Sequence, residues 1–361
     1  MKKIRIIGAV AVAVLWLCLA LWAWFKPADD LSSTERRPLE QFPAVSLENV
    51  LDAGFMADFE DYTLDQFPLR DGFRSVKALF QKYVLGQKDN NGIYVADGYA
   101  AQLEYPYDAD SIAHAVNRFQ YVYDNYLSDC DVYMTIVPDK GYYLAEENGY
   151  PAMDYEAMFE ELQAGMPYAE YIDLTDCLSL EDYYRTDTHW RQENLLPAAE
   201  KIADAMDITV GYFTPVTREE PFYGVYYGQA ALPMAPDDLV LMESDWLSAC
   251  RVYDHESGTW GSVYDLSKLD GDDLYEVYLS GSRSLLTIEN PNATTDRALI
   301  VFRDSFGSSM IPLLMEDYAR VDVVDIRYLN AAVLGNFLEF KDQDVLFLYS
   351  TLVLNNSETI K

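Results

Sequence analysis

Histidine, cysteine and positive charge are all scarce in this sequence. The chain has three histidines and four cysteines among 361 residues, and 26 Lys and Arg stand against 60 Asp and Glu, for a formal net charge of -34. So few histidines argue against a zinc site, and the cysteine spacing matches no zinc pattern. A surface with this excess of negative charge repels nucleic acid. We therefore expect no nucleic-acid partner, no metal and no other cofactor.

The cysteines predict no disulfide framework. Cys18 lies in an apolar N-terminal segment, which leaves Cys130, Cys177 and Cys250, an odd number that allows at most one bridge. We interpret all three as small buried apolar residues, the usual place for a free cysteine. Half of all residues are hydrophobic, so the chain has enough apolar side chains for a large core and is not expected to be disordered. Most of the 29 tyrosines are expected at the core edge and on the surface.

Residues 1–27 predict a membrane anchor. Basic residues near the start precede an uncharged apolar run over residues 6–25, long enough to cross about 30 Å of hydrocarbon as a helix. Tryptophans near its end suit the membrane interface, and they stand where a cleaved signal peptide would have small residues. The basic flank should stay in the cytoplasm. We expect an uncleaved anchor at 1–27, a tether at 28–46 and an extracytoplasmic catalytic domain at 47–361.

Helical and strand patterns alternate from about residue 108. Short apolar strands separated by helices favour a parallel sheet covered on both faces, so the predicted fold is α/β with three αβα layers around a mostly parallel sheet. Residues 210–290 are irregular and are interpreted as an insertion with some β structure. The expected strands are 132–137, 171–174, 298–302, 321–326 and 345–349, and the expected helices are 108–127, 155–163, 195–206 and 310–318.

Two helical stretches are expected ahead of this region, divided near Pro68. The apolar stripe of the first is formed by Leu47, Leu51, Phe55 and Phe59. A strand pair is expected at about 93–103, after a turn.

Two motifs far apart in the chain carry residues that suit nucleophilic catalysis. Residues 186–190 read Thr-Asp-Thr-His-Trp, and residues 303–307 read Arg-Asp-Ser-Phe-Gly directly after an apolar run. Functional groups gather beyond the carboxyl ends of parallel strands, which places Ser305 in a cleft. The Asp-x-His spacing brings a carboxylate to one imidazole nitrogen while the other points outward. We predict that Ser305 is the nucleophile, His189 the general base and Asp187 the residue that orients the imidazole.

Structural roles are the alternatives for these residues. Serine is a preferred helix cap, so Ser305 alternatively caps the following helix, a position for which Ser308 and Ser309 compete. Trp190 either shields the imidazole or packs in the core. His114 and His255 are interpreted as structural.

The two motifs, with Val-Val-Asp-Ile-Arg-Tyr at 323–328, resemble the DHHW family and the related alginate O-acetylation proteins of the AlgX/AlgJ type, which have an SGNH-hydrolase-like fold. Segments 35–39 (Glu-Arg-Arg-Pro-Leu), 65–70 (Asp-Gln-Phe-Pro-Leu-Arg) and 137–140 (Val-Pro-Asp-Lys) extend the resemblance over about residues 35–355.

The resemblance implies acyl chemistry on a cell-surface glycan, most often O-acetyl transfer. It implies the same roles for Ser305, His189 and Asp187, a polysaccharide substrate and a membrane protein that supplies the acyl group. The sequence departs from the family pattern in three ways. The DHHW proteins usually have His where Thr188 stands, typical SGNH enzymes have Gly where Arg303 stands, and their serine precedes their histidine.

The oxyanion site is predicted from weaker signals. By analogy one donor is the Ser305 N–H, and a second donor is expected from Gly281 or Ser282. Lys140 follows a predicted strand and is expected either to bind substrate or to support the oxyanion. A structural role is the alternative for all three. Arg327 is expected to pair with Asp325 or Asp304.

The leading hypothesis is an extracytoplasmic serine O-acetyltransferase or acetylesterase that acts on a polysaccharide. One alternative is a metal site formed by Asp187, His189 and Asp304, since carboxylate and imidazole suit several divalent ions. Another is a non-catalytic, membrane-anchored glycan-binding or cell-wall assembly protein with the same fold.

Overall fold

The computed structural model of this chain describes residues 2–46 and 54–361. These residues form two compact units, Met1–Asn91 with Tyr227–Pro233 and Gly92–Tyr226 with Met234–Lys361. Leu47 and Leu51, two members of the predicted apolar stripe, lie outside the described residues.

The first unit begins with the apolar helix α1 (Lys2–Phe25). Its segment Lys3–Phe25 contains an 18-residue window with a mean hydropathy of 2.6 and is long enough to cross a membrane. This helix is therefore a candidate for either a membrane anchor or a signal sequence.

Helices α3 (Gly54–Asp65) and α4 (Arg70–Tyr83) are separated around Pro68, as predicted. Proline lacks the N–H that a continuous helix requires. On α3, the rings of Phe55 and Phe59 stack with their centroids 6.0 Å apart, and Phe42 meets both edge-on. These rings form a small aromatic cluster within the first unit.

Ion pairs join the two N-terminal segments that carry the family resemblance. Arg37 donates to both carboxylate oxygens of Asp65, at 2.8 and 2.6 Å, and this lowers the pKa of Asp65 to about 2. Arg70 donates to Glu35, and Arg74 lies 2.7 Å from the same carboxylate. These charged side chains thus pair with one another, which assigns them a structural role in this unit.

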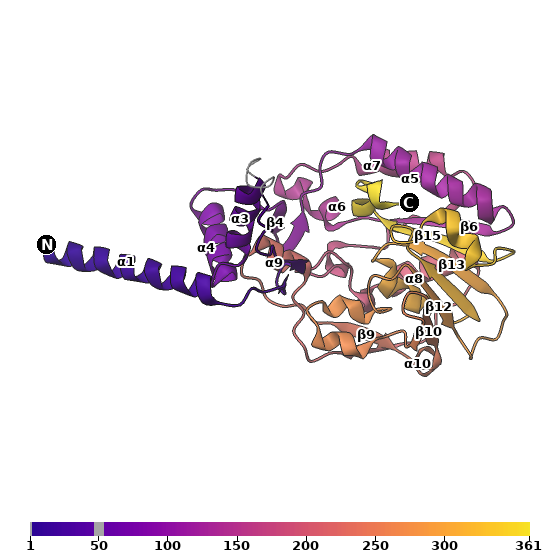
Figure 1. The fold of residues 1–361 in the computed structure, drawn as a ribbon. Coiled ribbons are helices and arrows are strands. Elements are labelled where there is room, and N and C mark those ends of the chain that lie inside the picture. The colour runs from indigo at the N-terminus through magenta and orange to yellow at the C-terminus, as the bar shows by residue number, and fades with distance from the viewer. Residues whose placement is uncertain (1, 47–53) are drawn as a thin grey trace. The chain divides into compact units, whose positions relative to one another are not determined.

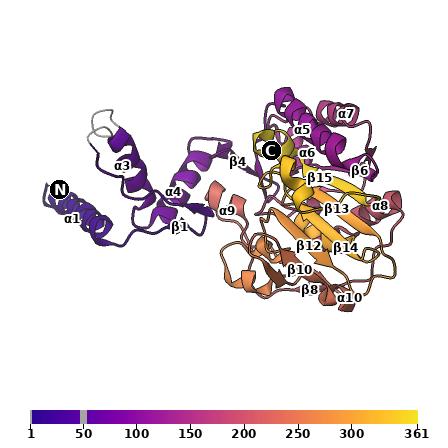
Figure 2. The same ribbon diagram turned by 45° about the vertical axis from the view of Figure 1, so that its right-hand side comes forward.

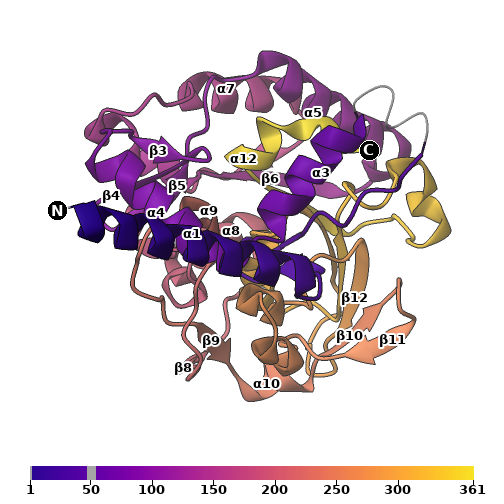
Figure 3. The same cartoon turned by 60° about the vertical axis from the view of Figure 1, so that its left-hand side comes forward.

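The second unit is built on an eight-stranded sheet (Figures 1 and 3). Four of its seven strand pairings, those from β14 to β7, are parallel, and the other three are antiparallel. In spatial order the strands are β11 (Thr259–Gly261), β10 (Arg251–Asp254), β12 (Leu285–Glu289), β14 (Arg320–Val324), β13 (Ala298–Arg303), β15 (Asp344–Ser350), β6 (Asp131–Val137) and β7 (Glu170–Tyr171).

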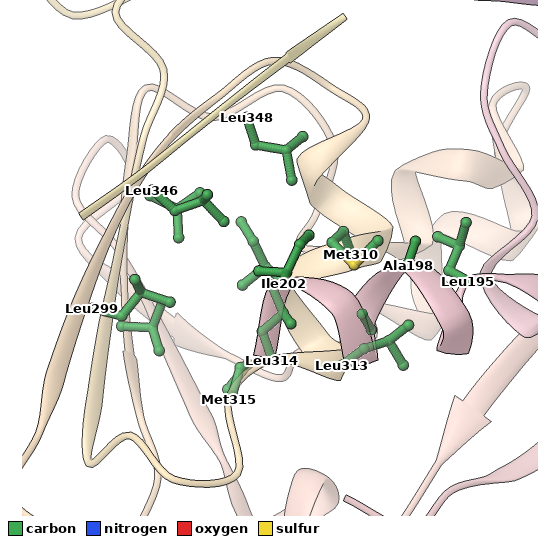
Figure 4. Packing of buried hydrophobic residues seen from close by; sticks show 14 of the residues in the cluster. Leu195, Ala198, Ile202, Leu299, Met310, Leu313, Leu314, Met315, Leu346 and Leu348 are labelled. Atoms are coloured by element: carbon green, nitrogen blue, oxygen red, sulfur yellow. The ribbon is translucent and has the colours of Figure 1, made fainter. Parts of the chain in front are cut away.

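One face of the sheet is covered by α8 (Leu196–Met206) and α11 (Gly307–Met310). Alternate residues of a strand point to opposite faces, and Leu299 of β13 and Leu346 and Leu348 of β15 point to this one. Figure 4 shows these leucines facing Ile202 of α8 and Met310 of α11.

Helices α5 (Ala109–Val122) and α7 (Tyr155–Gly165) cover the other face (Figure 2). The remaining alternate residues, Ile300 and Phe302 of β13 and Phe347 of β15, pack there against Phe119 of α5. Both faces of the central strands are therefore buried, and the predicted three-layer α/β fold with a mostly parallel sheet is confirmed.

The other described strands and α-helices are short. They are β1 (Leu31–Ser32), β2 (Arg37–Pro38), β3 (Asp89–Asn90), the predicted strand pair β4 (Ile93–Ala96) and β5 (Tyr99–Gln102), α6 (Lys140–Leu144), β8 (Thr214–Thr217), α9 (Val225–Ala230), β9 (Val240–Glu243), α10 (Asp245–Ala249) and α12 (Thr351–Leu354).

The structure adds one detail to the predicted arrangement and corrects two. The β structure expected within residues 210–290 includes β10, β11 and β12, antiparallel strands that extend the edge of the main sheet. The helix expected at 310–318 is wrong: α11 ends at Met310, and a 3-10 turn containing Pro312 follows. The expected burial of the cysteines holds only for Cys250, since Cys130 and Cys177 are half-buried; all three are free thiols.

Candidate active site

Ser305 lies just beyond the carboxyl end of the central strand β13, where a tight turn leads into α11. Asp304 holds this turn. Its carboxylate accepts hydrogen bonds from the Ser350 N–H and hydroxyl, at 2.7 and 2.6 Å, and from the Phe306 N–H at 3.0 Å. Ser350 ends the neighbouring strand β15, so Asp304 ties the two strand ends together. The position of Ser305 is thereby fixed from both sides.

The structure brings the three predicted residues into one hydrogen-bonded array. Ser305 Oγ lies 2.8 Å from His189 Nε2, and His189 Nδ1 lies 2.6 Å from Asp187 Oδ1. A carboxylate beside Nδ1 holds the ring proton there, which leaves Nε2 to accept the serine hydroxyl. The Ser305 side chain therefore bonds His189 and does not cap α11, whose N-cap has no side-chain hydrogen bond.

Asp187 is fully buried and has further donors. Its Oδ1 also accepts the His189 N–H at 3.1 Å, and its Oδ2 accepts the Val225 N–H at 2.9 Å. Gly224 packs so closely on this residue that an added Cβ would lie 2.3 Å from the Asp187 Cα. Only glycine fits at this position, which explains how the segment before α9 reaches the carboxylate.

Asp237 holds the start of the same motif. Its carboxylate accepts the Arg185 N–H at 2.9 Å and the Thr186 N–H and hydroxyl at 2.9 and 2.6 Å. The Thr186 hydroxyl oxygen in turn accepts the Gly224 N–H at 2.9 Å. No local sequence signal pointed to Asp237, because it is about 50 residues from the motif that it supports.

Lys140 supports the motif loop and does not serve the predicted substrate or oxyanion role. Its side chain is buried, and Nζ donates to the Tyr184 carbonyl at 2.9 Å and lies 5.0 Å from the centre of the Tyr226 ring. Tyr226 donates to the Thr188 hydroxyl oxygen at 3.0 Å. Burial lowers the pKa of Lys140 to about 7. The contacts of this ammonium group are thus with the loop before Asp187.

The predicted second oxyanion donor is not supplied by Gly281. Its N–H donates to the Tyr278 carbonyl at 3.1 Å, and its carbonyl accepts from Arg303 Nη2 at 3.2 Å. Ser282 is exposed, and no hydrogen bond among the described residues joins it to Ser305. By contrast, the Ser305 N–H has no acceptor among the residues that the structure describes, so it is available to a developing negative charge.

Tyr275 is a member of the site that the sequence did not reveal. Its ring lies parallel to the His189 imidazole, with the centroids 3.7 Å apart and an interplanar angle of 5°. No motif surrounds this residue, and it is one of many tyrosines in the region interpreted as an insertion. Of the two roles expected for Trp190, core packing is confirmed, because its side chain is buried in the core and its Nε1 donates to the Phe306 carbonyl at 3.0 Å.

The remaining polar residues named in the sequence have structural partners. His114 lies 3.1 Å from the Ser357 hydroxyl, and His255 lies 3.0 Å from the Thr287 hydroxyl. The Arg327 guanidinium forms two hydrogen bonds with Asp325, one of its two predicted partners, and the Arg327 N–H forms a third.

The metal alternative is not supported by this geometry. Asp304, its third proposed ligand, directs its carboxylate to Ser350 and the Phe306 N–H, away from a position shared with Asp187 and His189. Within residues 2–46 and 54–361, no group of three His, Cys, Asp or Glu side chains is arranged to hold a metal ion.

The fold and the array define a class: an α/β protein with serine, histidine and aspartate joined at the carboxyl end of a central strand. A family model described as DHHW protein matches residues 171–324, which include both motifs. The predicted resemblance to this family is confirmed over that stretch, which is shorter than the range expected from the sequence. No curated protein matches the chain.

Several solved structures are similar to this chain. A DHHW family protein from Eubacterium siraeum DSM 15702 has a TM-score of 0.62 and 21% identity, covering 75% of this chain and 95% of that chain. Bacillus cereus PatB1 with a sulfonyl adduct has a TM-score of 0.56 and 15% identity, covering 73% and 95%. The O-acetyltransferase domain of Pseudomonas putida AlgJ has a TM-score of 0.46 and 15% identity, covering 73% and 92%. At these identities the first two likenesses show a shared fold.

Proposed function

We propose that this protein is a membrane-anchored, extracytoplasmic serine O-acetyltransferase or acetylesterase that acts on a polysaccharide. The observation that carries the proposal is the array of Ser305, His189 and Asp187, with contacts of 2.8 and 2.6 Å around a nearly buried imidazole. A serine hydroxyl bonded to an imidazole, itself held by a carboxylate, is the arrangement that acyl transfer through a covalent intermediate requires.

In the first half of the proposed reaction, Ser305 Oγ attacks the carbonyl carbon of a bound acetyl ester while its proton passes to His189 Nε2. The imidazolium that forms is stabilised by Asp187. The oxyanion of the tetrahedral intermediate accepts the Ser305 N–H. The C–O bond to the leaving alcohol then breaks, His189 returns the proton to that alcohol, and an acetyl-Ser305 ester remains.

In the second half, the acceptor determines the outcome. His189 removes a proton from an incoming hydroxyl, which attacks the acetyl-Ser305 carbonyl, and Ser305 leaves with that proton. Water as acceptor gives an esterase, whereas a sugar hydroxyl gives a transferase. The same residues serve both reactions.

Two further observations support parts of the proposal. Sulfonyl reagents modify activated serine hydroxyls, and the structurally similar PatB1 carries a sulfonyl adduct. The basic residues Lys2, Lys3 and Arg5 at the start of α1 favour a cytoplasmic N-terminus, and this supports an extracytoplasmic position for the rest of the chain. The polysaccharide acceptor and a membrane protein that supplies the acetyl group are proposed from the DHHW and AlgX/AlgJ resemblance alone.

A chromogenic acetyl ester tests this function in the full-length, detergent-solubilised protein. The wild type should hydrolyse p-nitrophenyl acetate, and Ser305→Ala should lower turnover by about 10³-fold or more, because removal of the nucleophile leaves only binding and oxyanion contacts. Ser248→Ala, at an exposed position of α10, is the matched control and should keep wild-type turnover. Equal turnover by wild type and Ser305→Ala would overturn the proposal.

A second measurement separates transferase from esterase. The wild type is incubated with the ester and an unacetylated oligosaccharide, and acetylation is read as a mass increase of the oligosaccharide. An increase that depends on Ser305 indicates transfer. Release of acetate without a change in the oligosaccharide indicates hydrolysis.

A further inference from the structure

We propose that Tyr275 is a positioning residue for His189: its ring fixes the plane of the imidazole and stabilises the imidazolium that forms when Ser305 gives up its proton. The inference rests on the proposed function of the array. It adds a residue that neither motif contains.

The stack is close and nearly parallel. The centroids of the Tyr275 and His189 rings are 3.7 Å apart and the planes differ by 5°. Tyr275 is only 4% exposed, so little water competes for this face of the imidazole. The Phe306 ring lies 5.0 Å from the imidazole, tilted by 56°. The imidazole therefore packs against two aromatic rings, while its two nitrogens bond Asp187 and Ser305.

The Tyr275 hydroxyl anchors the ring to the nucleophile turn. It lies 2.8 Å from Ser309 Oγ and donates to the Ser305 carbonyl at 3.3 Å. Ser309 Oγ also accepts from Trp190 Nε1 at 2.9 Å. Tyr275 thus connects the turn that carries Ser305 to the loop that carries His189.

The backbone of Tyr275 is held as well. It lies in the 3-10 turn Leu274–Val277, and the Asp273 side chain caps that turn by accepting the Tyr275 N–H at 3.0 Å. The Tyr278 ring packs 5.0 Å away at 61°. With its backbone capped and its ring held by neighbours, Tyr275 presents a fixed surface to the imidazole.

A parallel ring has two effects on a general base. It resists rotation of the imidazole out of the plane in which Nδ1 meets Asp187 and Nε2 meets Ser305. Its π-face also attracts positive charge, and His189 is positive only after it has taken the proton. The attraction is therefore stronger in the transition state than in the ground state, which is the condition for a contribution to rate.

Other charged groups surround this pair, and a substitution of Tyr275 leaves them in place. Asp187 bonds the imidazole directly. The charges of Arg303, on β13, and of Asp304, in the turn after it, interact electrostatically with Tyr275. Lys140 of α6 interacts in the same way with Asp187. Because these groups are common to all variants at position 275, a difference between two such variants reports the stack itself.

The test compares Tyr275→Leu, which removes the π-face, with Tyr275→Phe, which keeps it and loses only the hydroxyl. Each full-length variant is titrated by NMR through its imidazole signals. The chain has only three histidines, so His114→Gln and His255→Gln identify the signals that do not belong to His189. Tyr212→Leu, at a highly exposed tyrosine, is the matched control.

Tyr275→Leu should move the midpoint of the His189 titration, and the acid limb of kcat/KM, to lower pH by up to about one unit. The same variant should lower kcat about tenfold. Tyr275→Phe should keep the wild-type midpoint. If Tyr275→Leu does not fold, Tyr275→Met fills the same space without a π-face and replaces it.

An unchanged midpoint in the folded Leu or Met variant, or an equal shift in Tyr275→Phe, would overturn the inference. The NMR titration requires no turnover. Failure of the stack is thus distinguished from failure of the proposed function, which Ser305→Ala tests separately.

Discussion

Replacing Asp187 by asparagine changes one oxygen to an NH2 group at a fully buried site where the carboxylate accepts three hydrogen bonds. Oδ1 faces the His189 Nδ1 at 2.6 Å and the His189 N–H at 3.1 Å, while Oδ2 faces the Val225 N–H at 2.9 Å. Asparagine has only one acceptor oxygen. Each orientation of the amide therefore places two donors against each other.

The two orientations fail for different reasons. With its oxygen at the Oδ1 position, the amide NH2 meets the Val225 N–H, and a buried donor without an acceptor costs about 1–3 kcal/mol. With its oxygen at the Oδ2 position, the NH2 donates to Nδ1. The ring proton then moves to Nε2, and His189 no longer accepts the proton of Ser305.

We expect Asp187→Asn to lower kcat for p-nitrophenyl acetate by about 10³–10⁴-fold, equivalent to about 4–5.5 kcal/mol of transition-state stabilisation. The free energy of unfolding in urea should fall by no more than about 1–3 kcal/mol, so the variant should stay folded. Asp204→Asn, at an exposed position of α8, is the matched control. A folded Asp187→Asn variant with kcat within tenfold of wild type would refute this reading of the carboxylate.

Two further predictions concern residues that hold the motif loop. Gly224→Ala places a methyl group 2.3 Å from the Asp187 Cα, so we expect this variant to lose turnover of p-nitrophenyl acetate. Gly261→Ala is the control and should keep wild-type turnover, because an added Cβ at Gly261 meets nothing within 4 Å. Equal turnover of the two variants would contradict the packing of Gly224 on Asp187. Burial lowers the pKa of Lys140 from 10.5 to about 7, so the unfolded state binds more protons across that window. Lys140 should therefore make the free energy of unfolding rise with pH, by up to about 1.4 kcal/mol per pH unit. Urea unfolding at pH 7 to 9 should show this rise in the wild type and not in Lys140→Met. If the free energies of unfolding of the wild type and of Lys140→Met depend on pH in the same way, Lys140 is already charged or solvated in the folded protein.

The central strands were predictable because their residues are apolar on both faces. In β13 and β15 successive side chains face α8 or α5 alternately, so both strands appear as continuous apolar runs with clear ends. The antiparallel strands β10 and β12 were not recognised as part of the sheet. Their contacts are antiparallel pairings between distant segments, which local patterns do not record.

In the candidate site, too, residues with a local sequence pattern could be predicted, and residues that only tertiary contacts bring there could not. Ser305, His189 and Asp187 stand in short motifs beside recognisable strands and helices, so their chemistry could be read from the sequence. Tyr275 and Asp237 reach the site only through tertiary packing, and neither has a local signature. Lys140 was misassigned because its position after a strand suggested the cleft, whereas its side chain turns inward to the Tyr184 carbonyl.

The most direct test of the central claim is covalent capture of Ser305. A sulfonyl fluoride forms a bond between Ser305 Oγ and sulfur, fluoride leaves, and His189 receives the hydroxyl proton, so labelling reports the activated serine itself. Peptide mapping by mass spectrometry should find the sulfonyl group on Ser305 in the wild type and find it lost in His189→Gln. Labelling of other serines instead, or equal labelling of Ser305 in His189→Gln, would contradict the account.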